Sequence, residues 1–313
     1  MIIGLDIGGT KTAVVAGTRT GEVLSRVQFA TSPERGFEQF YKQLSAVIPG
    51  VISGSKEHVD AISVSIGGPL NILEGIIESP PNLPGWDNIR LKERLAQSFS
   101  LPVFVEHDGN AGALAEFYFG AGRGFRNIVF LTMGTGLGAG LILDGKVYRG
   151  TTDTAGEVGH IRIADNGPEC YGKAGSFEGY GSGTGIARLA NMMFPALWSE
   201  SVTVLDVYAA FKDGSPEARR VFERAGMYIG RGFAMIADFI NPQRIILGGL
   251  GMRIADAFVP FAEAVFTKEA LPQSARACSI VPAQLGERIG DVASLCAALD
   301  QGRLIDARVI RGA

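Results

Sequence analysis

The sequence predicts an α/β protein with two domains, each built on a mixed β-sheet flanked by helices. The chain has 313 residues, and a domain usually takes about 100–200 residues. Apolar strand-like runs alternate with segments of helical periodicity. An apolar run, a turn rich in Gly and Thr, and a second apolar run occur twice, from Asp6 to Thr12 and from Thr132 to Gly140. The repetition indicates an internal duplication.

The first half alternates strands with helices. Phe37, Phe40, Tyr41 and Leu44 are spaced three and four apart, which predicts an amphipathic helix over residues 37–48. Short apolar runs that end in glycine or polar residues predict strands. We expect strands at residues 1–5, 13–16, 61–66 and 103–106, an additional strand at 22–30, and helices at 91–99 and 111–119.

The second half begins with another pair of strands and then becomes mainly helical. We expect strands at residues 128–132, 139–143 and 244–247, and helices at 186–193, 203–212, 216–240 and 292–299. The expected domains are a small one at residues 1–108 and a large one at 109–290, with a C-terminal helical segment, 291–313, packing back on the small domain.

The composition excludes several classes of protein. The chain has 43 glycines, but 46% of its residues are hydrophobic and the glycines have no fixed period, which excludes collagen and disordered linkers. The net charge is −3 without a basic run, so neither nucleic acid nor a membrane surface is an expected partner. The start of the sequence lacks secretory-signal features, and the longest uncharged stretch, residues 127–143, is too short for a membrane span. Three widely spaced cysteines fit a reducing cytoplasm.

The two glycine turns are candidate phosphate sites. A glycine turn between strands gathers backbone N–H groups into a concavity suited to phosphate oxygens, and a Cβ there would exclude the phosphate. In the first turn, Gly8 and Gly9 are followed by the donors Thr10, Lys11 and Thr12. The turn continues as a strand, unlike a Walker motif, which leads into a helix. The alternative is an ordinary tight hairpin, and the second copy of the pattern makes it less favoured.

Six motifs resemble a known superfamily and family. LDIGGTKTAVV, TMGTGLGAGL and NPQRIILGG resemble the first phosphate, second phosphate and adenosine segments of the actin, sugar-kinase and heat-shock-chaperone superfamily. EHDGNAGALAE, GEVGH and FEGYGSG resemble the ROK family of repressors and sugar kinases, in the expected order between residues 2 and about 250. The resemblance implies a two-domain, actin-like ATPase (ribonuclease H-like) fold with duplicated mixed sheets and a central cleft. It also implies ATP and Mg²⁺ as cofactors and a homodimer.

Asp108 is the candidate catalytic base. It follows the expected strand at residues 103–106, and the crevice of an α/β sheet lies at strand ends. Transfer of a phosphoryl group to a sugar hydroxyl needs a group that accepts the hydroxyl proton. In ROK kinases the matching aspartate has this role. The alternative is a helix N-cap, but Asn110 stands closer to the start of the expected helix at 111.

Six residues are candidate sugar contacts. Glu157 and His160, three residues apart between Gly156 and Gly159, can face one pocket and bind vicinal hydroxyls. The resemblance assigns both to sugar recognition and adds Glu178, for which the alternative is a solvated acid at a helix start. His107 stands where the family usually has a sugar-binding Asn, which leaves the preferred sugar open. The full set is Gly68, Asn82, His107, Glu157, His160 and Glu178.

The candidate nucleotide and metal contacts come from the phosphate and adenosine motifs. Asp6, before the first turn, can hold Mg²⁺ through a bound water. The bare backbone after the strand at 244–247 leaves room for adenosine, although a strand followed by a simple turn is the alternative. The complete set is Asp6, Gly8, Gly9, Thr10, Lys11, Thr12, Thr132, Gly134, Thr135, Gly136, Gly249 and Gly251. The sequence does not distinguish ATP from another donor such as polyphosphate.

A structural zinc ion is not expected, although ROK kinases often bind one. The family pattern uses a histidine matching His160 and three cysteines in C-x-C-G-x-x-G-C. Here the stretch reads GPECYGKAGSFEG: Cys170 matches the first cysteine, the second is missing, and Ser176 replaces the third. Two ligands cannot complete a tetrahedral site. The loop must be held by other contacts, for which Tyr171 and Phe177 packed in the core are candidates.

The resulting hypothesis is an ATP- and Mg²⁺-dependent kinase that phosphorylates the 6-hydroxyl of a hexose, with glucose as first candidate. Kinases for N-acetylmannosamine, N-acetylglucosamine, fructose or mannose are the alternatives within the family. A non-catalytic, sugar-responsive regulator is the alternative from another class. Repressors of the family resemble this chain but carry an N-terminal helix-turn-helix domain, and here the first phosphate turn begins within ten residues of Met1.

Overall fold

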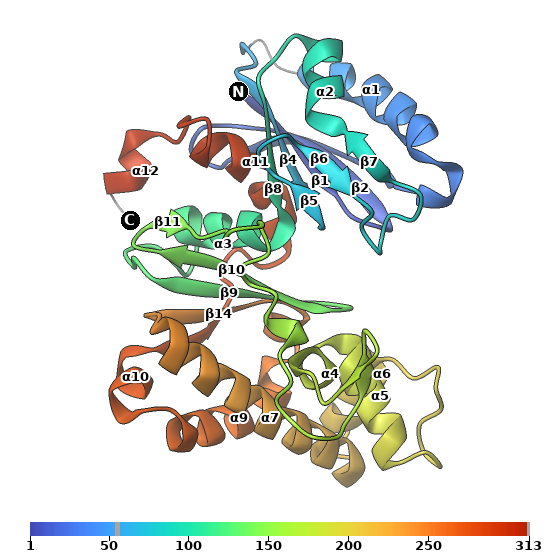
Figure 1. Ribbon diagram of the computed structural model, residues 1–313, viewed down its shortest axis with the longest axis vertical. Coiled ribbons are helices and arrows are strands. Elements are labelled where there is room, and N and C mark those ends of the chain that lie inside the picture. Colours follow the sequence, from blue (N-terminus) through green and yellow to red (C-terminus); the bar gives the residue numbers. More distant parts are fainter. Residues whose placement is uncertain (54–56, 312–313) are drawn as a thin grey trace. The chain divides into compact units, whose positions relative to one another are not determined.

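The computed structural model describes residues 1–53 and 57–311 of the chain. It forms two compact units (Figure 1). The first unit comprises Met1–Gly124, Arg149–Ala155 and Glu287–Ala313, and the second comprises Phe125–Tyr148 and Gly156–Gly286. The first unit therefore extends past residue 108, the boundary expected from the sequence, and includes the segment that follows residue 286. None of the helices in the described residues is long and apolar enough to cross a bilayer.

The first unit is built on a five-stranded mixed sheet in the order β3-β2-β1-β4-β8. Its strands are β1 (Ile2–Ile7), β2 (Lys11–Gly17), β3 (Val23–Ala30), β4 (Ala61–Ile66) and β8 (Val103–His107). β1 and β2 form an antiparallel hairpin, whereas β4 lies parallel to both β1 and β8. β4 is buried along its whole length, as expected for a central strand with helices on both faces.

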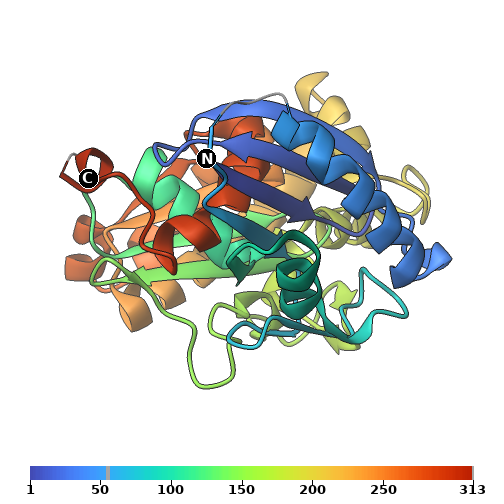
Figure 2. The same ribbon diagram turned by 90° about the horizontal axis from the view of Figure 1, so that it is seen from above.

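Helices lie on both faces of the first sheet (Figure 2), and alternate residues of β1 contact different ones. Ile3, Leu5 and Ile7 belong to the apolar core that contains the buried face of α1 (Phe37–Ser53). On the opposite face, a Cβ at Gly4 would lie 2.2 Å from Oγ of Ser294 in α11 (Ile289–Asp300). The period of two places Asp6 on the α11 side of the sheet.

The remaining elements of the first unit are shorter. They are β5 (Leu70–Asn71), β6 (Ile76–Glu78), β7 (Asp87–Arg90), α2 (Leu91–Phe99), α3 (Asp108–Phe119), α12 (Ala307–Arg311) and a 3₁₀ turn at Pro33–Arg35. β5, β6 and β7 form a small separate sheet that the sequence did not predict. Trp86, between β6 and β7, is fully buried against Phe37 and Phe40.

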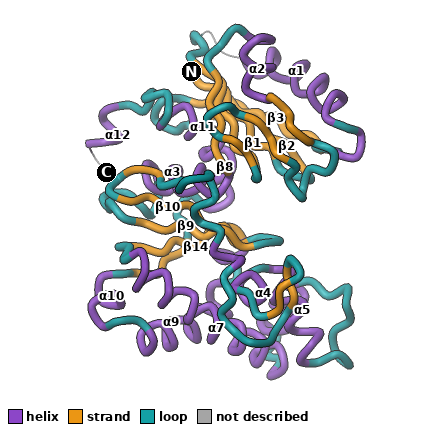
Figure 3. The backbone as a smooth tube through the Cα atoms, in the orientation of Figure 1, coloured by secondary structure: helices purple, strands orange, loops and turns teal. Residues whose placement is uncertain are grey.

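The second unit repeats the plan of the first (Figure 3). Its main sheet has the order β11-β10-β9-β14-β15. The strands are β9 (Ile128–Met133), β10 (Leu137–Leu143), β11 (Lys146–Val147), β14 (Arg244–Gly249) and β15 (Ser279–Pro282). β9 and β10 form an antiparallel hairpin, and β14 lies parallel to both β9 and β15. Strand order and directions match those of the first sheet, so the duplicated α/β fold predicted from the sequence is confirmed.

Helices cover the second sheet. They are α4 (Phe177–Gly181), α5 (Gly183–Met193), α6 (Val204–Lys212), α7 (Pro216–Ile240), α8 (Leu250–Arg253), α9 (Ala255–Glu269) and α10 (Pro272–Ala277). A 3₁₀ turn spans Val158–His160, another spans Gly286–Arg288, and a small hairpin joins β12 (Glu169–Cys170) to β13 (Lys173–Ala174). Gly226 and Gly230 let α7 approach α9 closely, since a Cβ at Gly230 would lie 2.4 Å from the carbonyl oxygen of Ala262.

One helix boundary corrects the sequence-based prediction. α3 begins at Asp108, not at residue 111, and His107 is its N-cap. The ring Nδ1 of His107 accepts a hydrogen bond from the Gly109 N–H at 3.3 Å, the role usually filled by Ser, Thr, Asp or Asn. Asn110, expected as the cap, is buried in the first turn of the helix. Asp108 therefore stands on the helix itself.

Candidate active site

Asp108 and His107 are adjacent at the junction of β8 and α3. Oδ1 of Asp108 accepts from the Gly109 N–H at 2.7 Å and lies 3.2 Å from Nδ1 of His107. The Gly109 N–H thus lies between Oδ1 of Asp108 and Nδ1 of His107, and its shorter contact is to the carboxylate. The Asp108 side chain is 49% exposed. The carboxylate is thus anchored through one oxygen at a helix N-terminus, where negative charge is stabilised, and is open to a substrate.

The glycine pair after β4 leaves space for these two side chains. A Cβ at Gly68 would lie 2.9 Å from the His107 ring, and one at Gly67 would lie 3.8 Å from Oδ2 of Asp108. β4 and β8 are parallel neighbours, so both junctions meet at one sheet edge. Gly68, predicted as a sugar contact, is placed directly against the His107 ring.

Asp6 lies near the end of β1 among other charged groups. Burial, followed by the charges of Asp108 and Asp291, raises the pKa of its carboxyl from 3.8 to about 6, and the charges of Lys11 and Arg26 oppose part of this shift. Arg26 Nε donates to both carboxylate oxygens of Asp291, at 2.8 and 2.9 Å. Asp6 is therefore a partly buried acid whose charge is incompletely compensated by the protein.

The first glycine turn is exposed at its tip and braced from below. Gly8, Thr10 and Lys11 are exposed or nearly so, and the Gly8 N–H donates to the Lys11 carbonyl at 3.1 Å. Thr12 is fully buried, and its hydroxyl lies 2.9 Å from that of Thr31, which donates to the Gly8 carbonyl. Thr12 therefore supports the turn, and it does not present its side chain to a phosphate as the sequence-based hypothesis supposed.

Gly9 is close to the loop that carries Asn82. A Cβ at Gly9 would lie 2.5 Å from the backbone oxygen of Asn82. The exposed Asn82 is thereby held beside the first glycine turn. The close approach of this loop therefore requires glycine at position 9, whether or not a ligand also contacts it.

The second glycine turn joins β9 to β10 in the second unit. The Gly134 N–H donates to the Gly136 carbonyl at 2.9 Å, and a Cβ at Gly134 would meet open space. At Gly136, a Cβ would lie 2.8 Å from Oε2 of Glu178, which accepts from the Leu137 N–H at 2.9 Å. Glu178 is 8% exposed, so it is not the solvated helix-start acid considered as its alternative.

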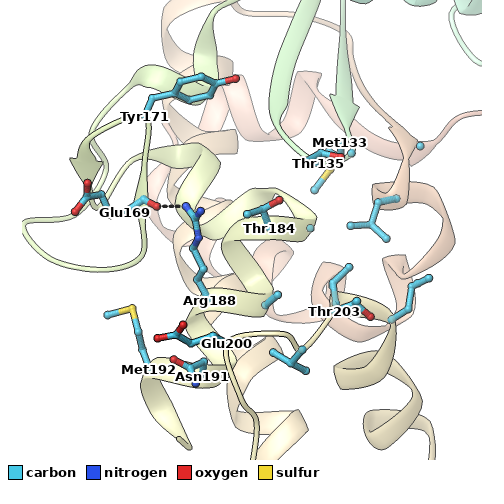
Figure 4. A pocket seen from close by; sticks show the side chains of 18 of the residues that line it. Met133, Thr135, Glu169, Tyr171, Thr184, Arg188, Asn191, Met192, Glu200 and Thr203 are labelled. Carbon is cyan, nitrogen blue, oxygen red and sulfur yellow. Dashed lines mark hydrogen bonds between the residues drawn. The ribbon is translucent and has the colours of Figure 1, made fainter. Parts of the chain in front are cut away.

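A pocket of about 1160 Å³ opens beside this turn (Figure 4). Its inner wall includes Gly134, Thr135 and Gly249, and α5 contributes Thr184, Ala187 and Arg188. In Figure 4, Arg188 points toward the Glu169 carbonyl, to which it donates a hydrogen bond. The remaining lining residues are Met133, Glu169, Tyr171, Gly172, Gly183, Asn191, Met192, Glu200, Val202, Thr203, Val204, Leu205, Leu250 and Arg253. The volume suits a nucleotide-sized ligand.

The two glycines predicted for the adenosine segment pack on β9. Gly249 has φ +57°, and a Cβ there would lie 2.4 Å from the Met133 carbonyl oxygen. A Cβ at Gly251 would lie 2.3 Å from the sulfur of Met133. Gly249 lines the pocket, whereas Gly251 is buried next to it.

Glu157 immediately precedes the 3₁₀ turn Val158–His160, and His160 is the last residue of that turn. Both side chains are exposed, and the His160 N–H donates to the Glu157 carbonyl at 3.2 Å. The Tyr171 ring lies 5.0 Å from the His160 ring. Lys173 Nζ donates to the His160 carbonyl at 2.7 Å. The β12–β13 hairpin thus packs directly on the histidine predicted to bind sugar.

The loop that lacks the family cysteines is held by this hairpin. Tyr171 and Gly172 have φ values of +50° and +66°, the pattern of a two-residue type I′ turn. Phe177 is buried, as expected, but Tyr171 is 62% exposed and is not a core residue. Cys170 is buried with Sγ 3.7 Å from Arg188 NH1. In the described part of the chain, no group of three or more His, Cys, Asp or Glu side chains is arranged to hold a metal ion.

The absence of structural zinc remains a prediction that metal analysis can test. Protein purified without added zinc is expected to contain much less than one zinc per chain, because two ligands cannot complete a tetrahedral site. Elemental analysis by mass spectrometry, with the buffer as blank, measures this directly. A near-stoichiometric zinc content would show that other side chains complete the site.

The comparison with known proteins decides the family. The model of the ROK family matches residues 2–298. The chain belongs to the ROK family. It is 30% identical over 303 residues to a glucokinase of Halalkalibacterium halodurans, covering 92% of each chain.

Solved ROK structures include both kinases and regulators similar to this ROK protein. A ROK glucokinase from Streptomyces griseus, solved with glucose and AMPPNP, matches with a TM-score of 0.77 and 30% identity over 96% of this chain and 99% of that one. A ROK transcriptional regulator, a homologue of the Escherichia coli Mlc protein, matches with a TM-score of 0.86 and 26% identity over 99% and 81%. Fold similarity alone therefore does not separate the two roles.

Several residues of the ROK protein's site escaped the sequence analysis. Asp291 and Arg149 lie outside the six motifs, and Glu106 is the first residue of EHDGNAGALAE but was given no role there. The sequence signal for Asp291 was its position, as an acidic residue directly before the last apolar helix. The start of α6 and its preceding loop, which line the pocket through Val202, Thr203 and Val204, carry no recognisable motif.

Proposed function

We propose that this ROK protein is an ATP-dependent sugar kinase that phosphorylates the 6-hydroxyl of a hexose, with glucose as first candidate. The observation that carries the proposal is Asp108, a half-exposed carboxylate fixed at a helix N-terminus next to His107. A repressor has no need of a proton acceptor at this position. The similarity to glucokinases supports the same reaction.

Asp108 is the proposed general base. One of its oxygens is anchored to the Gly109 N–H, so the carboxylate has a fixed orientation. It accepts the proton of the sugar hydroxyl as the hydroxyl oxygen bonds to the γ-phosphorus of ATP, the bond from this phosphorus to the bridging oxygen breaks, and ADP leaves. The imidazole of His107, next to this carboxylate, can form a hydrogen bond with another sugar oxygen. A base held in this way aligns the nucleophile, which contributes strongly to phosphoryl transfer.

The second unit contributes the proposed nucleotide pocket and sugar contacts. At the pocket wall, Thr135 is the proposed donor to phosphates and Gly134 leaves open space beside it, and the region near Gly249 is proposed for adenosine. Glu157, His160 and Glu178 are the proposed sugar contacts. Gly8, Gly9, Thr10 and Lys11 are the proposed phosphate contacts of the first unit, whereas Thr12 is left out because it is buried.

Asp6 fits a magnesium ion by its charge environment. It is a partly buried carboxylate with further acids nearby, and a Cβ at Gly290 would lie only 2.7 Å from its Oδ2. A bound cation would offset the burial and the repulsion between acids that together raise its pKa. When bound, Mg²⁺ neutralises phosphate charge, and Asp6 would hold it through water.

A coupled ADP-release assay over glucose, mannose, fructose, N-acetylglucosamine and N-acetylmannosamine tests the proposal. We expect hexose-dependent ADP release, with glucose giving the highest kcat/KM. A higher kcat/KM with an N-acetylhexosamine would make that sugar the proposed substrate instead of glucose. Absence of turnover with every sugar, in protein shown to be folded, would contradict the kinase and favour a sugar-responsive regulator. Replacing ATP by polyphosphate in the same assay identifies the donor.

Filling the pocket is expected to weaken nucleotide binding selectively. Ala187 is 8% exposed and lines the pocket from α5, so Ala187→Phe would project a ring into the space. We expect the KM for ATP to rise by about tenfold or more, since an occupied pocket excludes part of the ligand surface. The KM for the hexose should change little. An unchanged KM for ATP would show that the nucleotide binds elsewhere.

A further inference from the structure

Glu106, the residue before His107, is a buried carboxylate whose two oxygens accept hydrogen bonds from different groups of donors. Its side chain is fully buried. Oε1 accepts from the His107 N–H at 3.2 Å and from Asn110 Nδ2 at 3.0 Å. Both of these donors belong to the start of α3. One oxygen of Glu106 is therefore committed to the turn that carries Asp108.

The other oxygen of Glu106 is committed to a different set of donors. Oε2 accepts from Arg149 Nε at 3.1 Å and from the NH2 group of the same guanidinium. Gln301 Nε2, just beyond α11, donates to it at 3.1 Å. Two guanidinium donors on one oxygen fix the rotation of the carboxylate, and this in turn fixes where Oε1 points.

Arg149 comes from a short segment of the first unit that is bounded in sequence by parts of the second unit. The segment Arg149–Ala155 belongs to the first unit, while Tyr148 and Gly156 belong to the second. Arg149 also lies 3.9 Å from Asp300, whose Oδ1 accepts from the Tyr118 hydroxyl of α3 at 2.9 Å. Asp153 of the same segment accepts from the Ile72 N–H at 3.2 Å.

A buried ion pair by itself adds little to the stability of a fold. Apolar side chains of similar size often give equal or greater stability, because both charges must lose their hydration. What an ion pair supplies is a defined direction for each hydrogen bond. Asn110 depends on such a directed bond. Its side-chain Oδ1 has no hydrogen-bond partner among the described residues, so the hydrogen bond from its Nδ2 to Oε1 of Glu106 orients the side-chain amide.

We propose that Arg149, acting through Glu106, is a positioning residue that sets the start of α3 and with it His107 and Asp108. The proposal rests on the proposed kinase function only for its kinetic consequence. Arg149 holds Oε2 of Glu106, Oε1 holds the His107 N–H and the Asn110 amide, and these hold the first turn of the helix. A displacement of the base by about 1 Å is enough to slow a reaction by about 10²-fold.

Four variants and one control test this chain of contacts kinetically. Arg149→Met, Arg149→Lys, Glu106→Gln and the double variant Glu106→Gln/Arg149→Met are compared with wild type. The control is Arg126→Met, because Arg126 is an exposed arginine 3.7 Å from a single carboxylate, Asp144. Thermal unfolding of each variant is recorded so that only folded protein enters the kinetic comparison.

The expected kinetic result separates positioning from mere stability. In Arg149→Met, kcat should fall by about 10- to 100-fold with the KM for ATP within about threefold of wild type. Arg149→Lys should keep an intermediate kcat, because lysine retains the charge without the guanidinium fork. The double variant should lose no more than the worse single variant, as expected of residues that act in series. Arg126→Met should match wild type.

A kcat near wild type in folded Arg149→Met would overturn the proposal, and so would additive losses in the double variant. If Arg149→Met does not fold, the same criteria apply to Arg149→Lys and Glu106→Gln.

Amide hydrogen exchange tests the proposal independently of activity. The peptide covering residues 105–112 should exchange faster in Glu106→Gln and Arg149→Lys than in wild type, whereas peptides of α7 should not change. Unchanged exchange at 105–112 would overturn the proposal. If wild type turned over no sugar, the kinase function would fail while the exchange result would still decide the role of Arg149.

Discussion

Asp108→Asn is expected to lower kcat by about 10²- to 10⁴-fold, the range that a positioned general base contributes. Asparagine has nearly the same shape and can still accept from the Gly109 N–H through its amide oxygen, as the aspartate does. It cannot accept the hydroxyl proton. The KM values for hexose and ATP should change little, because the substitution removes an interaction made mainly in the transition state.

The control for Asp108→Asn is the neighbouring substitution His107→Asn. Asparagine is a good N-cap, so it can replace the Nδ1 that accepts from Gly109, and it is the residue usual at this position in the family. We expect His107→Asn to keep most of the activity and to change the relative kcat/KM values among hexoses. Thermal unfolding should show both variants folded. A folded Asp108→Asn enzyme with near wild-type kcat would show that another group accepts the proton.

Asp6→Asn is expected to abolish most activity and yet to stabilise the ligand-free protein at neutral pH. Folding raises the pKa of Asp6 from 3.8 to about 6, mainly through burial. Because the pKa of Asp6 is higher in the folded than in the unfolded protein, Asp6 does not reduce the free energy of unfolding below about pH 4. The reduction grows as the pH rises and is complete once the pH has passed about 6. At pH 7 the ionised Asp6 therefore costs the fold on the order of 1–3 kcal/mol. Asparagine removes that cost.

Denaturant unfolding at pH 4.5 and pH 7.5 measures the effect. Asp6→Asn should be more stable than wild type at pH 7.5, and this difference should be clearly smaller at pH 4.5, where only part of the cost of ionising Asp6 is present. Asp60→Asn is a control of opposite sign, because the hydrogen bond from Arg19 lowers the pKa of Asp60, which also bonds the amino terminus at 2.9 Å. Its removal should destabilise the protein at pH 7.5. An Asp6→Asn protein less stable than wild type at pH 7.5 would contradict this account of Asp6.

The sequence was sufficient to predict the elements whose characteristic residues are contiguous along the chain. The strand–glycine turn–strand repeats predicted both hairpins and the duplicated sheets, because the turn residues and the apolar runs are contiguous. Long amphipathic helices such as α7 were also predicted. α9 was missed: it contains Pro260 and has a wide apolar surface, so neither periodicity nor composition set it apart.

The contacts that sequence could not supply are those between distant residues. Arg149 and Glu106 are 43 positions apart, and nothing in either neighbourhood indicates that they pair. Burial of Thr12 depends on Thr31, which follows β3. The start of α3 was misplaced because an imidazole serves as its cap, a role rarely assigned to histidine from sequence. The homodimer, the cytoplasmic location and the absence of zinc remain predictions.

The most direct test of the central proposal is to identify the product by ³¹P NMR. Wild-type protein with ATP, Mg²⁺ and glucose should form a hexose 6-phosphate in equal amount to ADP, and Asp108→Asn under the same conditions should form almost none. Formation of ADP with inorganic phosphate but no sugar phosphate, or of a sugar phosphorylated at a position other than the 6-hydroxyl, would contradict it.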